Sequence, residues 1–269
     1  MAIITISRGS YSKGKEIAEQ VAARLGYECV AREALLEASE QFNIPETKLV
    51  RAVHDSPSIF DRFTHGREKY VAYIQAALLH RVQKGNVVYH GLAGHFLLRG
   101  ISEVLKVRIT ADLKDRIAVV MARDHVDEKT ARQILKHDDE QRSKWSHYLY
   151  GIDTADPNLY DLMIHVNKIT TNGAVDIICR TAELDSFQPS PQSLKAMADL
   201  VLACDVKSRL IAVKPDVEVH ADDGIVKIGM AVQAAREDAL VREIKNMAQA
   251  VPGVKEVHVE TSVSSFLED

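Results

Sequence analysis

The sequence of 269 residues predicts an α/β fold with a parallel sheet, followed by a small α+β module with the element order αββαβ. Three observations support this prediction. Short β-branched runs alternate with segments of helical periodicity over the first 184 residues, which is typical of a parallel sheet covered by helices. A glycine-containing loop joins the first strand to the first helix. Two prolines and three serines then interrupt the pattern at 185–193, and a different arrangement of elements follows.

The first predicted strand is the run Ile3-Ile4-Thr5-Ile6, which suits a strand buried on both faces. The next predicted element is a helix over 16–25 with apolar residues at helical spacing, and Gly26 ends it. Further helices are predicted over 32–42, 46–54, 67–84 and 174–182. A long polar helical region is predicted over 112–149. Further strands are predicted over 86–90, 104–109 and 161–166.

Residues 185–194 are predicted to be a linker between a domain of residues 1–184 and a module of residues 195–269. Asp222-Asp223-Gly224 lies between two alternating runs and predicts a hairpin turn. The predicted elements of the module are a helix over 194–210, strands over 217–221 and 225–232, a helix over 234–250 and a strand over 254–260.

Composition and charge restrict the class of protein. Hydrophobic residues make up 46% and charged residues 27%, which is typical of a chain that buries a core. No apolar run approaches the roughly 18 residues of a membrane span, and the N-terminus lacks a signal-peptide pattern. We therefore expect a cytoplasmic protein in which Cys29, Cys179 and Cys204 are reduced thiols, with no zinc site. Residues 195–269 hold 9 Lys and Arg against 13 Asp and Glu, so neither nucleic acid nor an anionic membrane is expected as a partner.

Residues 9–15 fit the pattern G-x-x-x-x-G-K between a strand and a helix, which is the context of a phosphate-binding loop. Backbone N–H groups and the helix N-terminus stabilise an anion there, and Lys15 would reach the terminal phosphates. Glu16 stands where Ser or Thr usually supplies a hydroxyl to Mg²⁺. The alternative is a glycine-containing turn in which Glu16 complements the helix dipole. The candidate phosphate-binding residues are Gly9, Ser10, Ser12, Lys13, Gly14, Lys15 and Glu16.

Four segments in this order resemble the cytidylate kinase-like family over about residues 2–184. The opening Ile4-Thr-Ile-Ser-Arg8…Gly14-Lys15-Glu16-Ile17-Ala18 resembles I-T-I-S-R-E-x-G-S-G-G-R-E-I-A. The resemblance implies a P-loop kinase-type fold of three layers, with an acceptor-binding lobe over 32–84 and a helical lid over 124–157. The other three similar segments are Gly26-Tyr27 with Arg32-Glu33, residues 85–91 and residues 156–162.

The resemblance also implies ATP and Mg²⁺ as cofactors, and phosphoryl transfer supported by loop amides and basic side chains. Mapped onto this sequence, the implied catalytic residues are Lys15, Arg116 and Arg142. Arg123 and Arg132 are further basic residues of the predicted lid. Each arginine could instead lie solvated on an exposed helix face.

Several residues depart from the pattern of the family. Tyr11 and Lys13 stand at loop positions where the family has glycine, which adopts positive φ without steric cost. Ala31 replaces an aspartate on the acceptor side. Leu92 replaces an arginine that would be expected to hold the acceptor's phosphate, and leucine cannot do so. These losses affect acceptor binding more than ATP binding.

Metal ligation by side chains is not expected. Asp138 and Asp139 could ligate Mg²⁺, but adjacent residues of a helix point apart, which favours a solvated helix face for both. The spacing of His90 and His95 favours core or pocket-lining roles. The histidines of the lid, His125, His137 and His147, are expected at the surface.

Residues 195–262 resemble a BON domain through Val217-Glu218-Val219, Asp223-Gly224 and the Pro252-Gly253 turn into the last strand. Met230 stands where that family has a glycine. The resemblance implies phospholipid binding or protein interaction. Because the segment is acidic, we favour protein–protein contact or self-association over lipid binding, and no catalysis is expected from it.

Two functions remain open. The first is ATP- and Mg²⁺-dependent phosphoryl transfer to a nucleotide-like or other small acceptor, which Lys15 and the lid arginines favour. The second is a non-catalytic nucleotide sensor that signals to a partner through the BON-like module. The altered loop and Leu92 favour the second, so the sequence leaves open whether the chain is an enzyme.

Overall fold

The computed structural model describes residues 2–31, 33–45, 48–49, 66–91, 94–232 and 237–263. Most of the helix predicted over 46–54 lies outside the described residues, and so do Arg32 and Leu92. The account below concerns the described residues.

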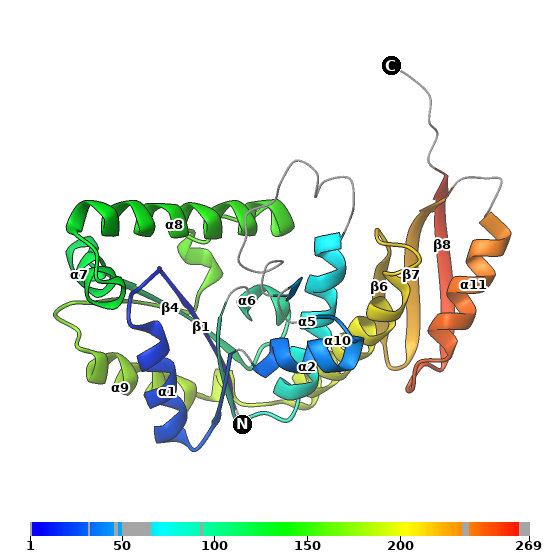
Figure 1. The fold of residues 1–269 in the computed structure, drawn as a ribbon. Coiled ribbons are helices and arrows are strands. Elements are labelled where there is room, and N and C mark those ends of the chain that lie inside the picture. The colour runs from blue at the N-terminus through cyan, green and yellow to red at the C-terminus, as the bar shows by residue number, and fades with distance from the viewer. Residues whose placement is uncertain are drawn as a thin grey trace.

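In these residues, five parallel strands form the main sheet, in the order β2-β3-β1-β4-β5 (Figure 1). β1 lies at the centre, and its Ile3 pairs with Val87 on one side and Val104 on the other. The connection from β1 leads to β2 on one side of it, and the connection from β3 crosses to β4 on its other side. Such a reversal opens a crevice at the carboxyl ends of the strands, the place where α/β sheets bind ligands. The strands are β1 (Ile3–Arg8), β2 (Glu28–Val30), β3 (Val87–His90), β4 (Val104–Ala111) and β5 (Leu162–Val166).

Helices cover both faces of this sheet (Figure 1). One face packs on α1 and α9 through a core that contains Ile4 and Ile6, and the other packs on α2, α5 and α6 through a core that contains Ile3. The alternation of β1 side chains between two apolar cores explains its continuous β-branched sequence. The three layers confirm the predicted α/β fold. The helices are α1 (Gly14–Leu25), α2 (Glu33–Phe42), α5 (Gly66–Val82), α6 (Gly94–Leu97) and α9 (Thr171–Ala182).

The polar region predicted as one helical stretch over 112–149 forms two helices, α7 (Leu113–Asp124) and α8 (Glu128–Tyr150). His125 ends α7 in the left-handed conformation with a φ of 54°, and the Asp127 side chain caps α8 by accepting from the Thr130 N–H. The two helices form an arm that lies above the sheet in Figure 1. The buried residues that join them are Ile117, Val120, Ala131 and Leu135.

The C-terminal module has the predicted αββαβ order. β6 (Glu218–Asp222) pairs antiparallel with β7 (Ile225–Val232), and β8 (Glu256–Val263) pairs parallel with β7. α11 (Glu237–Gln249) and the C-terminal part of α10 (Pro191–Leu210) pack on this sheet. Of the helices that the structure describes, α8 and α10 included, none is both long enough and apolar enough to cross a membrane.

α10 begins inside the predicted linker, because Ser190 and Ser193 form a capping box that starts the helix at Pro191. A short 3₁₀ turn, η2 (Asp185–Phe187), precedes it. The division at 184 and 195 therefore remains a prediction, and the regular structure continues through most of the segment.

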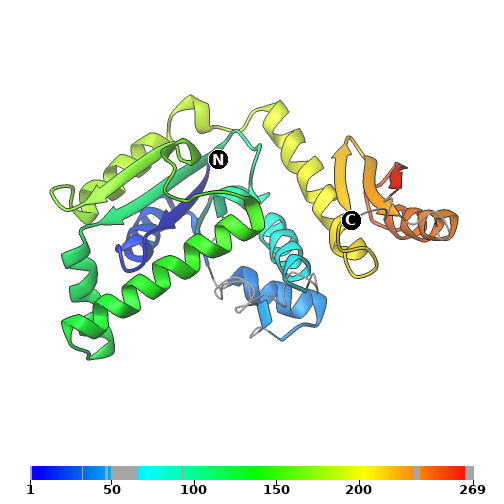
Figure 2. The same ribbon diagram turned by 90° about the horizontal axis from the view of Figure 1, so that it is seen from above.

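α10 contributes to two apolar cores. Its Met197, Val201 and Cys204 lie in the core of the main sheet with residues of α5, whereas Val206 and Leu210 lie in the core of the module (Figure 2). Burial raises the pKa of the Cys204 thiol to about 12, so this side chain packs as an uncharged group. His80 Nε2 of α5 lies 2.8 Å from Asp205 Oδ1 of α10, at hydrogen-bond distance.

Candidate functional site

The segment between β1 and α1 adopts a strained loop conformation. Tyr11 and Lys13 have φ values of 61° and 62°, in the left-handed region that favours glycine. The similar family has glycine at both positions, so this chain keeps the loop shape without the residues that adopt it freely. Such strain persists where the surrounding structure enforces it, as at ligand-binding loops. We call residues 9–16 the phosphate loop.

Backbone donors of the phosphate loop are available at the start of α1. The first N–H groups of a helix have no partner within the helix, and the N-cap residue Lys13 supplies no side-chain hydrogen bond to them. Gly14 allows this close turn, since a Cβ there would lie 2.7 Å from the Arg8 Cβ. The Ser10 hydroxyl is buried and has no hydrogen-bond partner in the described residues. These unsatisfied donors fit an anion.

The other predicted phosphate-binding side chains lie differently. Ser12 Oγ donates to the carbonyls of Gly9 (2.9 Å) and Ile109 (3.1 Å), so it holds the loop rather than facing a ligand. Lys15 is exposed, and its Nζ lies 3.7 Å from Glu19 Oε1.

One cavity lies on the α9 side of the phosphate loop. Tyr11, Lys13 and Glu16 line it together with residues of α7 and of the turn between β5 and α9. Its volume is about 600 Å³. The phosphate loop therefore borders cavities on two sides, because Gly9 lines the cavity described next.

Four arginines line a cavity of about 280 Å³ at the carboxyl end of β1. We call it the arginine chamber. Arg116 and Arg142 were predicted from the sequence, and Arg8 and Arg108 were missed as site residues. Arg8 was visible as the end of the run Ile4-Thr-Ile-Ser-Arg8 that opens the first similar segment. Arg108 could have been found from strand alternation, since it pairs with Ser7 at the end of β1. The role of Arg108 can be seen only in the folded structure, where residues of the lid line the same cavity.

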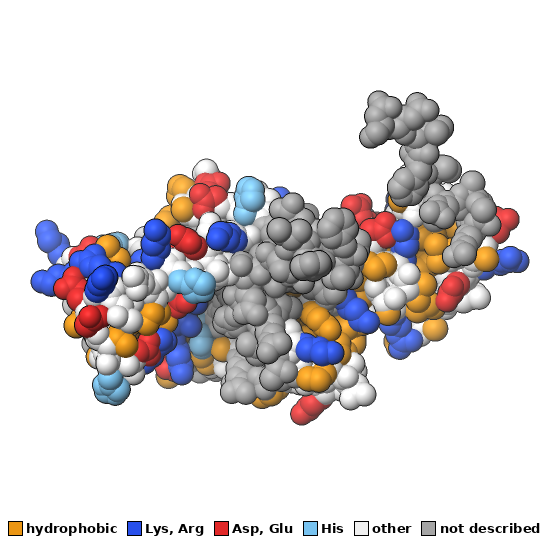
Figure 3. Space-filling model, turned by 45° about the horizontal axis from the view of Figure 1, so that its top comes forward, with side chains coloured by type: hydrophobic (Ala, Val, Ile, Leu, Met, Phe, Trp, Pro, Cys, Tyr) orange, Lys and Arg blue, Asp and Glu red, His pale blue; other side chains and the backbone are white. Residues whose placement is uncertain are grey.

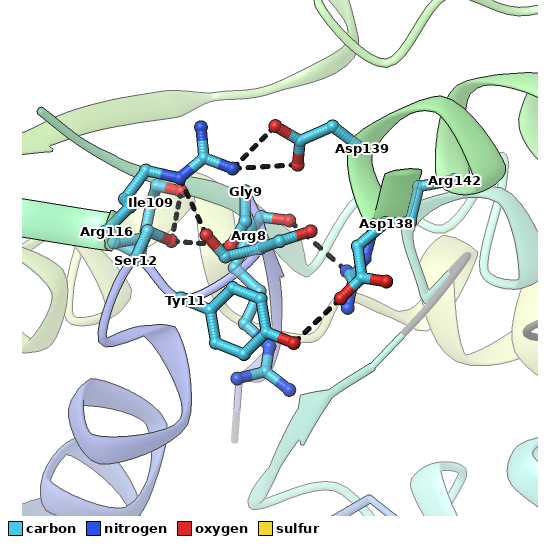
Figure 4. A network of polar contacts seen from close by, with 10 residues as sticks. Arg8, Gly9, Tyr11, Ser12, Ile109, Arg116, Asp138, Asp139 and Arg142 are labelled. Atoms are coloured by element: carbon cyan, nitrogen blue, oxygen red, sulfur yellow. Dashed lines mark hydrogen bonds and ion pairs between the residues drawn. The ribbon is translucent and has the colours of Figure 1, made fainter. Parts of the chain in front are cut away.

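Arg116 joins the phosphate loop to the lid (Figure 4). Its Nε donates to the Ser10 carbonyl at 2.7 Å, and its Nη2 contacts both carboxylate oxygens of Asp139 at 2.6 and 2.8 Å. Only 15% of the Arg116 side chain is exposed, so this ion pair is partly shielded from water. The Asp139 carboxylate is thus paired with the guanidinium of Arg116, which was predicted to bind phosphate.

Arg8 and Arg142 carry charge without a carboxylate partner. Arg142 Nη1 contacts the Arg8 carbonyl at 3.5 Å, and no ion pair within 4.0 Å involves either arginine in the described residues. Burial lowers the pKa of both guanidiniums, and the neighbouring charge of Arg8 lowers that of Arg142 further. An arginine stays protonated at neutral pH, so this cost indicates a site that favours an anion.

Asp138 and Asp139 were expected on a solvated helix face, and the structure corrects this expectation. Asp138 accepts a 2.7 Å hydrogen bond from the Tyr11 hydroxyl, and Asp139 pairs with Arg116 (Figure 4). The two side chains point apart, as expected. Asp138 nevertheless joins α8 to the phosphate loop, and Asp139 joins α8 to α7. Arg123 lies over the Tyr11 ring at 4.5 Å from its centroid.

The remaining candidates are peripheral. Arg132 is exposed and pairs with Glu128 one turn away on α8. His90 is buried, and no group of three or more His, Cys, Asp or Glu side chains in the described part of the chain could hold a metal ion. On the face drawn in Figure 3, basic side chains near α7 are interspersed with acidic ones.

The comparisons with known proteins agree with this architecture. The model of the cytidylate kinase-like family matches residues 3–168. The chain is 31% identical to a cytidylate kinase of Staphylothermus marinus over 35% of this chain and 53% of that protein. It is 26% identical to a cytidylate kinase of Archaeoglobus fulgidus over 69% of this chain and 97% of that protein. In the alignments with Staphylothermus marinus and Sulfolobus acidocaldarius, the chain spans about half the length of the relative.

Among solved structures, an uncharacterized protein from Eubacterium ventriosum aligns with a TM-score of 0.52 at 20% identity, over 68% of this chain and 99% of that protein. This likeness concerns the fold alone. The family model, however, spans more than half of the sequence and includes the phosphate loop, β4 and the lid. The chain belongs to the cytidylate kinase-like family.

Proposed function

We propose that this chain binds ATP with Mg²⁺ and transfers a phosphoryl group to a nucleotide-like or other small acceptor. The observation that carries this proposal is the arginine chamber beside the phosphate loop. It gathers four guanidiniums, and in the described residues only Arg116 pairs with a carboxylate. Phosphoryl transfer depends on positioning and charge neutralisation, which such a chamber provides. Membership in a kinase-like family supports the same function.

In this proposal the donor's phosphates lie against the phosphate loop. The N–H groups at the start of α1 and the unpartnered Ser10 hydroxyl are the donors that would bind them. Lys15 would turn from Glu19 towards the terminal phosphates. The cavity lined by Tyr11 and Lys13 would hold the nucleoside part of the donor.

The acceptor would lie in the arginine chamber, on the other side of Gly9. Mg²⁺ commonly keeps several waters and binds through one or two carboxylates together with substrate phosphates. Asp153 lines the chamber and is a suitable oxygen ligand, whereas both oxygens of Asp139 contact Arg116. One carboxylate together with substrate phosphates fits this ion. Bound there, Mg²⁺ would supply further neutralisation of phosphate charge.

A non-catalytic nucleotide sensor is the second candidate, and one observation favours it. The Tyr11–Asp138 and Arg116–Asp139 contacts tie the lid to the phosphate loop. A nucleotide that displaced these contacts would move the lid. α10 packs on α5 and on the C-terminal module, so it offers a physical route to that module.

We further propose that the C-terminal module, which resembles a BON domain, serves protein–protein contact or self-association in the cytoplasm. The acidic balance of residues 195–269 supports a protein partner over an anionic lipid surface. Comparing the sedimentation of the full chain at several concentrations tests self-association directly.

Calorimetry with ATP, GTP, CMP and dCMP, each with and without Mg²⁺, tests the main proposal. We expect ATP to bind, and Lys15→Ala to weaken that binding at least about tenfold, because a charged phosphate contact is lost. Arg132→Ala is the matched control, since this lid arginine is exposed and distant from the loop contacts. Absence of ATP binding to the unaltered chain would refute the first candidate, and absence of binding by every nucleotide of the panel would refute both.

Product analysis separates the two candidates. If ATP binds and a phosphorylated acceptor forms, the chain is an enzyme. If ATP binds tightly and no member of the acceptor panel is phosphorylated, the sensor is favoured.

A further inference from the structure

Arg108, like Arg8, is an arginine of the chamber to which the sequence analysis assigned no role. It lies on β4 opposite Ser7 of β1, on the sheet face that lines the chamber. Its Nη1 contacts the Tyr160 hydroxyl oxygen at 3.1 Å and Ser7 Oγ at 3.5 Å. Both partners are neutral, so no counter-charge offsets the guanidinium in this cavity.

Among the partly buried arginines that the structure describes, those without a counter-charge all lie in the chamber. Within the described residues, Arg8, Arg108 and Arg142 form no ion pair with a carboxylate at 4.0 Å or less, whereas the partly buried Arg81 and Arg116 both do. Withdrawing an arginine from water without a counter-charge costs free energy. Three such residues in one cavity indicate a ligand with more than one negative charge.

Tyr160 holds Arg108 in place. The Tyr160 hydroxyl donates to the Thr154 carbonyl at 3.0 Å while it accepts from Arg108. The guanidinium carbon also lies 5.4 Å from the centroid of the Tyr160 ring. A guanidinium fixed in this way loses little conformational freedom when it binds a ligand, which favours affinity.

The position of Arg108 relates it to the sequence departure at residue 92. The chain has Leu92 where an arginine would be expected to hold the acceptor's phosphate. The preceding residue, Gly91, lines the arginine chamber, as Arg108 does. Arg108 thus supplies a positive charge to the cavity that Gly91 lines, from β4 on the other side of β1.

We propose that Arg108 determines acceptor specificity by binding a phosphomonoester group of the acceptor in the arginine chamber. The inference rests on the proposed kinase-like function and deepens it. A dianionic phosphate suits the excess of guanidiniums better than a single carboxylate, and its oxygens match the guanidinium fork. Acceptors without a phosphate are then poor ligands.

The inference predicts opposite effects of one substitution on stability and on binding. Arg108→Leu removes an uncompensated charge, so the thermal midpoint of the unliganded full chain should rise or stay unchanged. The same variant should bind CMP about 10- to 100-fold more weakly, because a hydrogen-bonded charge pair with phosphate is lost. If Arg108 only held Tyr160 in place, the variant would lower the midpoint.

The experiment titrates the full chain with CMP, cytidine, ribose 5-phosphate and inorganic phosphate, by calorimetry and by thermal shift. The variants are Arg108→Leu and Arg108→Lys, with Arg132→Leu as the matched control on an exposed part of the lid. We expect CMP to bind at least tenfold more tightly than cytidine, Arg108→Lys to keep part of that preference, and the control to keep all of it.

Equal binding of CMP and cytidine, or unchanged CMP binding by Arg108→Leu, would overturn the inference. So would the failure of all phosphate-bearing probes to bind the unaltered chain. ATP binding is measured separately on each variant and should be unaffected by Arg108→Leu. If ATP does not bind while phosphate binding depends on Arg108, the kinase-like function fails and the anion site remains.

Discussion

The Tyr11 hydroxyl donates a 2.7 Å hydrogen bond to Asp138 Oδ2, joining the phosphate loop to α8 across 127 positions of sequence. Tyr11 takes the place of a loop glycine in the similar family, so the residue that strains the loop also holds the lid. With the Arg116–Asp139 ion pair, it forms a latch between loop and lid. The latch holds α8 close to the phosphate loop.

Replacing Tyr11 should open this latch. Tyr11→Phe removes the hydroxyl and keeps the ring and the backbone strain, so we expect faster amide hydrogen exchange in α8 and a loss of about 1–2 kcal/mol in stability. Glu140→Gln on the exposed side of α8 is the control and should leave exchange unchanged. Unaltered exchange in Tyr11→Phe would show that the hydrogen bond does not hold the lid.

The latch should also depend on pH. Burial, together with the hydrogen bond to Asp138, raises the pKa of Tyr11 above its ordinary value near 10. The folded state therefore holds this proton more tightly than the unfolded state. The stabilisation is complete below pH 10 and declines as the pH rises through the higher pKa of the folded state. The exchange difference between the unaltered chain and Tyr11→Phe should shrink above pH 10.

Lys13→Gly should stabilise the protein. Lys13 has a φ of 62°, and relief of a left-handed conformation at a residue with a Cβ is worth roughly 1 kcal/mol. Lys13→Ala keeps the Cβ and should give no such gain. Chemical denaturation of the two variants measures the difference, and equal stabilities would mean that the strain is relieved elsewhere.

Asp139→Asn should increase anion affinity. The carboxylate now neutralises Arg116, and its removal leaves that guanidinium available to a ligand. We expect pyrophosphate to bind several-fold more tightly, as measured by calorimetry, and Glu140→Gln to have no effect. Weaker binding by Asp139→Asn would indicate that Asp139 contributes to anion binding and does not compete with the anion for Arg116.

The boundary between the two parts of the chain can be tested with fragments. The sequence predicts that residues 1–184 fold alone. α10, however, places Met197, Val201 and Cys204 in the core of the main sheet, and each buried apolar side chain contributes about 1.5–3 kcal/mol. A fragment of residues 1–213 should therefore have a higher thermal midpoint than one of residues 1–184. Equal midpoints would favour the predicted boundary.

Much of the fold could be predicted because its elements have clear periods. The run from Ile3 to Ile6 and the helix that Gly26 ends are local signals, and both appear where expected. β2 and α6 were missed because three and four residues are too few to show a period. The break at His125 was missed because a left-handed residue other than glycine leaves no sequence signal.

The candidate site was predictable only in part. The pattern of residues 9–15 located the phosphate loop, since a strand, a glycine turn and a helix follow one another locally. The partners of Asp138 and Asp139 depend on how the lid folds back onto β1, which periodicity does not encode. In the sequence, Arg108 fits the alternating pattern of an ordinary strand. Its place in the site is evident only in the structure, where Tyr160 contacts it and residues of the lid line the same cavity.

The membership of α10 in both cores has a consequence for folding during synthesis. The main sheet is complete once β5 and α9 have left the ribosome, but part of its apolar surface stays uncovered until Cys204 emerges. At translation rates of about 5–20 residues per second, that interval lasts on the order of seconds. During that interval the nascent chain should expose apolar surface, which the turns of α10 from Met197 to Cys204 cover before the C-terminal sheet is made.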